Sequence, residues 1–178
     1  MASERVKKLV HAALFAALTA AAAWVMIPLP YVPVTLQTFF VILAGALLGA
    51  YFGALSMVAY LLLGFIGLPV FAGGQSGLGV LAGATGGYLV GFIFCAIVTG
   101  LVVKMKRSPG FLWYCLAMAA GTMALYACGV LQLSAILHMP LARAAIVGAL
   151  PFVPGDTIKI IIASTVAAKL HKDREGRR

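Results

Sequence analysis

The chain has 178 residues, of which 63% are hydrophobic and 10% are charged, and its mean hydropathy is +1.10. Soluble domains carry about 25% charged residues, so this composition excludes a soluble fold and predicts an all-α integral membrane protein. The net charge of +9 does not indicate nucleic-acid binding, because most of the basic residues lie in three clusters, near residues 5–8, 104–107 and 169–178, beside the ends of apolar runs. That distribution is typical of the cytoplasmic side of membrane proteins.

The first apolar run covers residues 9–27 and follows the basic segment 1–8. A secretory signal peptide has a similar pattern, but roughly 19 apolar residues are enough to span a bilayer. We therefore expect a retained first helix after a cytoplasmic N-terminus, 1–8. Alanines recur along it at four-residue spacing in two series: Ala12, Ala16 and Ala20, and Ala13, Ala17 and Ala21. Small residues at this spacing let another helix approach closely in lipid, and the sequence leaves open whether that helix belongs to this protein or to a partner.

Segment 38–66 is long for one membrane span and short for two. If the N-terminus is cytoplasmic, the basic loop 104–107 is also cytoplasmic only when an even number of spans precedes it. We therefore divide the segment into helices 35–50 and 51–66, joined by a tight turn near Gly49 and Gly53.

Later apolar runs each fit one span: 86–103, 111–133 and 156–170. The predicted fold is therefore a six-helix transmembrane domain, residues 9–170, with both termini cytoplasmic and a basic tail at 171–178. Three outer connections, 27–33, 68–87 and 133–154, carry almost no charge, unlike loops that face water. We expect them to fold back over the helices and cover a pocket that opens to the outside. The glycine-rich segment 68–87 lacks the lysine of a Walker A loop and the spacing of a dinucleotide fingerprint, so we expect no nucleotide site.

Asp156 is the only acidic residue between Glu4 and Asp173, and Lys159 follows it by about one helical turn. Because a charge inside a bilayer is costly, it usually marks a ligand or ion site. Asp156 could instead cap the helix that follows the Pro-Gly pair at 154–155. Lys159 favours more than a cap, since a cation in the first turn opposes the helix dipole and needs a negative partner. We expect a small, largely apolar ligand with hydrogen-bond donors for Asp156 and an acceptor or anion for Lys159.

The few other polar residues at the outer helix ends are candidate ligand contacts: Thr35, Gln37, Gln75, Thr85, Tyr88, Tyr126 and Gln132. Local hydrogen bonding to the backbone explains each of them equally well. The scattered cysteines and histidines predict neither a metal site nor a disulfide framework. One carboxylate without clustered histidines also argues against a membrane-embedded enzyme.

Four ordered segments resemble the BioY family: IPLPYVPVTLQTF at 27–39, GLPVFAGG at 67–74, GATGGYLVGF at 83–92 and PFVPGDTIK at 151–159. The resemblance covers residues 8–170, and Ala84 departs from it by standing where the family usually has proline. The family comprises the biotin-specific substrate-binding (S) components of energy-coupling-factor (ECF) transporters. It implies a six-helix protein of the cytoplasmic membrane that binds biotin with high affinity from the outside and needs no cofactor.

The resemblance also implies docking through the small-residue face of helix one, at Ala13, Ala17 and Ala21, onto a module of a T component and two ATPase subunits. Biotin offers ureido N–H donors for Asp156 and a carboxylate for Lys159 or a helix N-terminus, and the sequence does not decide which end meets the pair. The expected substrate contacts are Asp156, Lys159, Gln75, Thr85, Tyr88, Tyr126, Thr35 and Gln37. Two alternatives stay open: an S component for another vitamin such as thiamine or riboflavin, and a stand-alone proton-coupled carrier that uses Asp156 as its relay.

Overall fold

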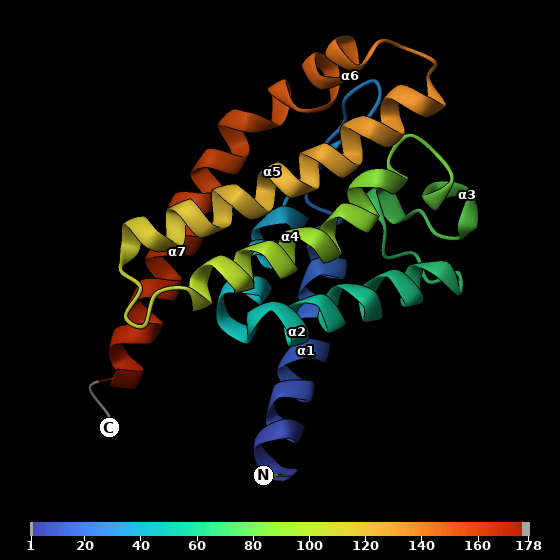
Figure 1. Ribbon diagram of the computed structural model, residues 1–178. Helices are drawn as coiled ribbons and strands as arrows, with labels where there is room; N and C mark the ends of the chain where they lie inside the picture. The colour runs from blue at the N-terminus through green and yellow to red at the C-terminus, as the bar shows by residue number, and fades with distance from the viewer. Residues whose placement is uncertain (1, 176–178) are drawn as a thin grey trace.

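The structure is a computed structural model that describes residues 2–175, so the end of the predicted tail, 176–178, lies outside the described residues. The fold is mainly helical, as predicted, with one two-stranded hairpin (Figure 1). The elements in chain order are α1 Ala2–Ala22, β1 Met26–Ile27, β2 Val34–Thr35, α2 Gln37–Phe65, η1 Ala72–Gly74, α3 Leu78–Leu81, α4 Gly86–Lys104, α5 Phe111–Ile136, α6 Leu141–Gly148, η2 Leu150–Phe152 and α7 Val153–Glu175, where η marks a short 3-10 helix.

Four helical segments within the described residues are long and apolar enough to cross a membrane. They are α2, α4, α5 and the stretch Leu141–Asp173 that joins α6, η2 and α7. These segments make the chain a multi-pass membrane protein. The finer count of six crossings, which adds α1 and divides α2, stays a prediction.

α2 is sharply bent at Gly49, where the backbone has φ 78° and ψ 175°. This region of backbone space is essentially restricted to glycine. A Cβ built on Gly53 would lie 3.0 Å from the Cα of Gly45, so the chain on one side of the bend packs against the chain on the other. The two halves leave the bend in different directions (Figure 1). The turn expected near Gly49 is therefore present, within one helical element.

The first and last helices differ from the predicted ranges 9–27 and 156–170. α1 ends at Ala22, and Met26 pairs with Thr35 in an antiparallel hairpin around the proline-rich segment 28–33, where prolines fix φ and supply no N–H to extend a helix. α7 begins at Val153 and includes Pro154 in its first turn, where a missing N–H costs nothing. Asp156 is consequently inside the helix, and the interpretation as an N-cap is wrong.

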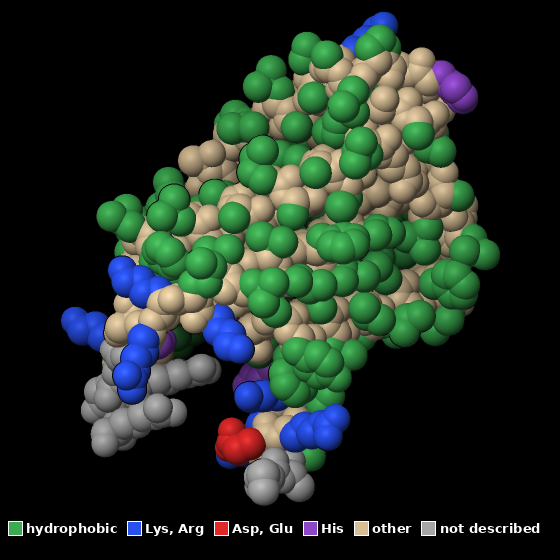
Figure 2. All heavy atoms as spheres, viewed as in Figure 1, with side chains coloured by type: hydrophobic (Ala, Val, Ile, Leu, Met, Phe, Trp, Pro, Cys, Tyr) green, Lys and Arg blue, Asp and Glu red, His purple; other side chains and the backbone are tan. Residues whose placement is uncertain are grey.

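α4 lies at the centre of the packing, with α2 on one side and α5 on the other, while α1 packs on α2 and α7 packs on α5 and α2. Glycines permit this closeness: a Cβ on Gly91 would lie 3.0 Å from the backbone oxygen of Leu125. Both termini and the α4–α5 connection lie toward one end of the molecule, and α3 and α6 lie toward the other (Figure 1). Figure 2 shows a largely hydrophobic flank between these ends.

Candidate functional site

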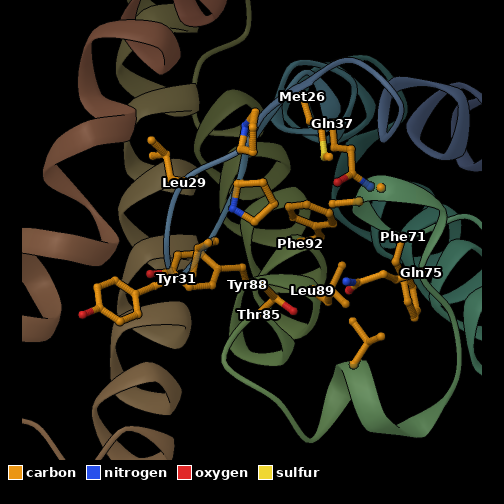
Figure 3. A pocket seen from close by; sticks show the side chains of 16 residues that line it. Met26, Leu29, Tyr31, Gln37, Phe71, Gln75, Thr85, Tyr88, Leu89 and Phe92 are labelled. Carbon is orange, nitrogen blue, oxygen red and sulfur yellow. The ribbon is translucent and has the colours of Figure 1, made fainter.

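A cavity of about 380 Å³ lies at the end of the molecule that carries the hairpin and α3. Its walls come from the hairpin loop, the start of α2, the segment around η1 and the first turns of α4 (Figure 3). Most of the lining is apolar, with a few polar side chains among it: Gln37, Gln75, Thr85 and Tyr88. Ligand pockets are typically 300–1,000 Å³ and combine apolar walls with a few placed polar groups, so this cavity suits a small organic ligand.

A smaller cavity of about 50 Å³ adjoins the first and contains the buried charge pair. Val32, Tyr88 and Phe92 line both cavities and therefore lie where the two meet. Asp156 and Lys159 both line the smaller cavity, and their side chains are 7% and 13% exposed. The pair is thus largely buried and lies next to the larger pocket.

Asp156 accepts three hydrogen bonds, one from each of three different parts of the chain. Lys159 Nζ lies 2.8 Å and Thr38 Oγ1 also 2.8 Å from Oδ1, and the Tyr126 hydroxyl lies 2.6 Å from Oδ2. A carboxylate has about four acceptor positions, so roughly one position on Oδ2 is left for a ligand donor.

Lys159 uses all of its donors within the protein. Its ammonium group donates to the backbone oxygen of Thr35 at 2.6 Å, to Thr38 Oγ1 at 2.8 Å and to Asp156 Oδ1. An ammonium group has three hydrogens, and all three are taken. The pair consequently links α7 to β2, α2 and α5.

Thr38 is a part of this site that sequence reasoning missed. It donates to Asp156, 118 residues further along the chain, and accepts from Lys159. Thr38 lies three residues after Thr35, in the first turn of α2, which borders the pocket. This position was the sequence signal that could have identified it as a site residue.

Gln37 and Tyr88 line the large cavity but have protein partners as well. The Gln37 amide nitrogen donates to the Tyr60 hydroxyl at 2.5 Å, and the Gln37 side-chain oxygen accepts from Thr35 Oγ1 at 3.1 Å. The Tyr88 hydroxyl donates to the backbone oxygen of Gly148 at 2.6 Å, which fixes a ring that lines both cavities. These contacts hold the pocket walls in place.

The eight predicted contact residues divide between the two cavities. The large one takes Gln37, Gln75, Thr85 and Tyr88, and the small one takes Thr35, Tyr88, Tyr126, Asp156 and Lys159. Gln132 lines neither. It donates to the backbone oxygens of Leu81 and Gly83, both at 2.8 Å, and so fixes the segment between α3 and α4.

The two alanine series on α1 point in different directions. Ala12 and Ala16 are buried, whereas Ala13, Ala17 and Ala21 are exposed. The first series therefore packs within the protein, and the second leaves a small-residue face open. Among the described residues, no group of three His, Cys, Asp or Glu side chains could hold a metal ion.

Comparison with known proteins identifies the family. The profile of the BioY family matches residues 1–176. "Biotin transporter BioY" of Thermotoga maritima is 45% identical over 166 residues, which cover 93% of this chain and 96% of that protein. The protein of the same name from Rhodobacter capsulatus is 40% identical over 181 residues. The alignment covers 90% of this chain and 91% of that protein.

Among solved structures, the S-component for biotin from an ECF-type ABC transporter superposes with a TM-score of 0.87 at 30% identity. The match covers 97% of this chain and 94% of that one. Sequence and fold agree over nearly the whole length, and the chain belongs to the BioY family.

Proposed function

We propose that this protein is the biotin-specific S component of an ECF-type transporter, which binds biotin on the outer side of the cytoplasmic membrane for uptake. Its relatives are biotin transporters, and one matching structure is a biotin S-component. The observation in the structure that supports the proposal best is the buried Asp156–Lys159 pair beside a 380 Å³ cavity. A mostly apolar cavity beside a hydrogen-bonding carboxylate suits biotin, which is an apolar ring and chain carrying ureido N–H donors.

The hydrogen bonds favour one orientation of biotin. Because all three hydrogens of Lys159 are taken while Asp156 keeps about one acceptor position, a donor is better matched to the pair than an anion. The ureido ring would then reach the small cavity and the carboxylate would lie in the large one, among polar groups such as Gln75 and Thr85. Within the described part of the chain, the side chains of these two residues form no hydrogen bond.

The substrate is tested by purifying the protein in detergent and assaying a denatured extract for biotin. We expect roughly stoichiometric biotin, or tight binding of labelled biotin after it is washed out, and no competition by excess thiamine or riboflavin. An empty protein that also fails to bind labelled biotin would overturn the proposal, and competition by another vitamin would favour an S component for that vitamin.

The orientation is tested separately with biotinamide, which lacks the charge of the carboxylate. If the ureido ring faces the pair, Lys159→Met weakens biotin and biotinamide by the same factor, and the ratio of the two affinities is unchanged. If the carboxylate faces Lys159, the variant weakens biotin alone and the ratio falls toward one. The measurement compares labelled-biotin displacement by the two ligands on the wild type and the variant.

We further propose that the exposed face of α1 at Ala13, Ala17 and Ala21 docks onto a T component, which is joined to two ATPase subunits. Small exposed residues at four-residue spacing support this proposal, since they allow close helix–helix approach in lipid. ATP hydrolysis would then belong to the partners, and the chain itself would be a transporter subunit without enzymatic activity.

The docking proposal is tested with Ala17→Trp, which adds bulk to this face, and with Leu112→Trp as a matched control on an exposed position of α5. Ala17→Trp is expected to abolish co-purification of the T component and to leave biotin binding unchanged, whereas Leu112→Trp keeps both. Uptake that persists without the module and is abolished by a protonophore would instead favour a stand-alone proton-coupled carrier.

A further inference from the structure

A second cavity lies at the opposite end of the molecule, where α4 joins α5. It has a volume of about 220 Å³, and three basic side chains from the end of α4 and the connection that follows line it: Lys104, Lys106 and Arg107. Apolar side chains from α2, α4 and α7 form other walls, among them Leu47, Val103 and Leu170. One cavity thus combines three cations with several apolar side chains, and Tyr114 and His171 also line it.

Among the side chains that the structure describes, none of the three cations forms an ion pair with a carboxylate. The ion pairs there are Lys7–Glu4 and Lys159–Asp156, neither of which involves this cavity. Lys106 has one favourable contact, over the ring of Trp113 at 5.5 Å from its centroid. The general excess of cations on the cytoplasmic side explains why basic residues occur here, but it does not require them to converge on one cavity. Neighbouring like charges repel, and an anion between them would relieve that repulsion.

The position of the cavity selects the kind of anion. Met105, which lies between Lys104 and Lys106, and Leu112, in the first turn of α5, are 77% and 74% exposed, as side chains that face lipid are expected to be. Figure 2 shows Lys and Arg side chains gathered at this end, directly beside the hydrophobic flank. The boundary between an apolar flank and a basic end is the level at which lipid phosphates lie.

We propose that this cavity binds the phosphate headgroup of an anionic phospholipid. Lys104, Lys106 and Arg107 meet the phosphate, and the apolar walls contact the glycerol and the first part of an acyl chain. Basic pockets between transmembrane helices on the cytoplasmic side bind acidic headgroups in this way. The site is separate from the proposed biotin pocket and does not depend on it.

The test measures binding of phosphatidylglycerol to the full-length protein in neutral detergent, by native mass spectrometry of protein–lipid adducts over a lipid titration. The variant Lys104→Gln/Lys106→Gln/Arg107→Gln removes the three charges. Arg5→Gln/Lys7→Gln/Lys8→Gln is the matched control, because it removes three charges from the end of α1. Lys104→Arg/Lys106→Arg/Arg107→Lys keeps the charge and exchanges the side chains.

We expect the first variant to weaken phosphatidylglycerol binding by at least about tenfold, and the control and the charge-keeping variant to stay within about twofold of the wild type. Phosphatidylcholine should bind more weakly than phosphatidylglycerol to the wild type and should not distinguish the variants. Circular dichroism and biotin retention verify that each variant is folded.

Three results would overturn the proposal. Equal weakening in the first variant and in the α1 control would show general attraction to positive charge rather than a site. Full competition by glycerol 3-phosphate, which has no acyl chains, would assign the cavity to a soluble phosphate compound. If Lys104→Gln/Lys106→Gln/Arg107→Gln fails to fold, the charge-keeping variant still tests the proposal. Loss of phosphatidylglycerol binding in that variant would also refute a site that depends on charge.

Discussion

Asp156→Asn is expected to lower both the stability of the protein and its affinity for biotin. The contacts of Asp156 give a separate magnitude for each effect. The variant removes the negative partner from Lys159, whose side chain is only 13% exposed. Breaking a buried ion pair by removing one partner costs about 3–5 kcal/mol. Lys159 keeps the Thr35 backbone oxygen and Thr38 Oγ1 as acceptors, so we expect the lower end of this range, about 3 kcal/mol. A lost hydrogen bond to a charged group, about 1.5–3 kcal/mol, corresponds to roughly a 10- to 150-fold weaker biotin affinity.

A double variant distinguishes the role in ligand binding from the role in folding. In Asp156→Asn/Lys159→Met no unpaired charge is left. The asparagine oxygen can accept from Thr38, and the asparagine amide nitrogen can donate to the hydroxyl oxygen of Tyr126. Replacing both members of a buried ion pair is often nearly neutral, so the free energy of unfolding should return to within about 1 kcal/mol of the wild type. Biotin binding should stay lost.

Unfolding of the three proteins in mixed micelles with increasing SDS, followed by circular dichroism, gives the stability order, and equilibrium binding of labelled biotin gives the affinities. Wild-type biotin affinity in Asp156→Asn would refute a direct contact between the carboxylate and the ligand. Recovery of binding in the double variant would show that the single variant loses biotin only because it is unstable.

Three further substitutions probe the walls and the bend. Gly129→Ala places a methyl group against the Tyr88 ring, so the affinity for labelled biotin should fall about tenfold or more. The control Gly79→Ala has open space around its Cβ and should bind biotin normally. Equal affinities of the two variants would contradict a role of the Tyr88 ring in lining the pocket. In Gly49→Ala the new methyl group contacts no other atom, but alanine is forced to φ 78°. The free energy of unfolding should therefore fall by about 1–3 kcal/mol in the same SDS titration. An unchanged unfolding midpoint would mean that this residue does not fix the bend. Gln132→Leu removes the anchor of the α3–α4 segment, so hydrogen exchange of residues 78–86 should accelerate, and unchanged exchange would show that other contacts hold the segment.

The sequence predicted the central helices well because strong local signals punctuate them. Glycines precede 86–103 and 111–133 and basic residues follow 86–103, and α4 and α5 begin at the predicted residues and end within three residues of the predicted positions. The turn near Gly49 was predicted from the sidedness of the basic loop rather than from local pattern. The end of α1 was predicted wrongly, since apolar composition alone does not distinguish the strand Met26–Ile27 from a continuing helix.

The candidate site was predictable in its charges but not in its connections. A lone carboxylate and a lysine one turn apart stand out in an apolar chain, and outer polar residues such as Tyr88 and Tyr126 are few enough to list. That Thr38 would reach Asp156 depends on how α2 packs against α7, which residue spacing within one segment does not report. For the same reason the sequence did not reveal that the ammonium group of Lys159 is fully occupied.

At the proposed site, the hydrogen bonds around Asp156 would make the ligand part of the folding equilibrium. Thr35, Thr38 and Tyr126 tie three segments to α7 through one side-chain pair, so a ligand that fills the last acceptor position on the carboxylate would hold the same segments together. A ligand that binds only the folded state at a hundred times its Kd adds about 2.7 kcal/mol to stability. The empty protein would then be the form most exposed to unfolding and proteolysis, and the supply of ligand would govern how long each copy survives in the membrane.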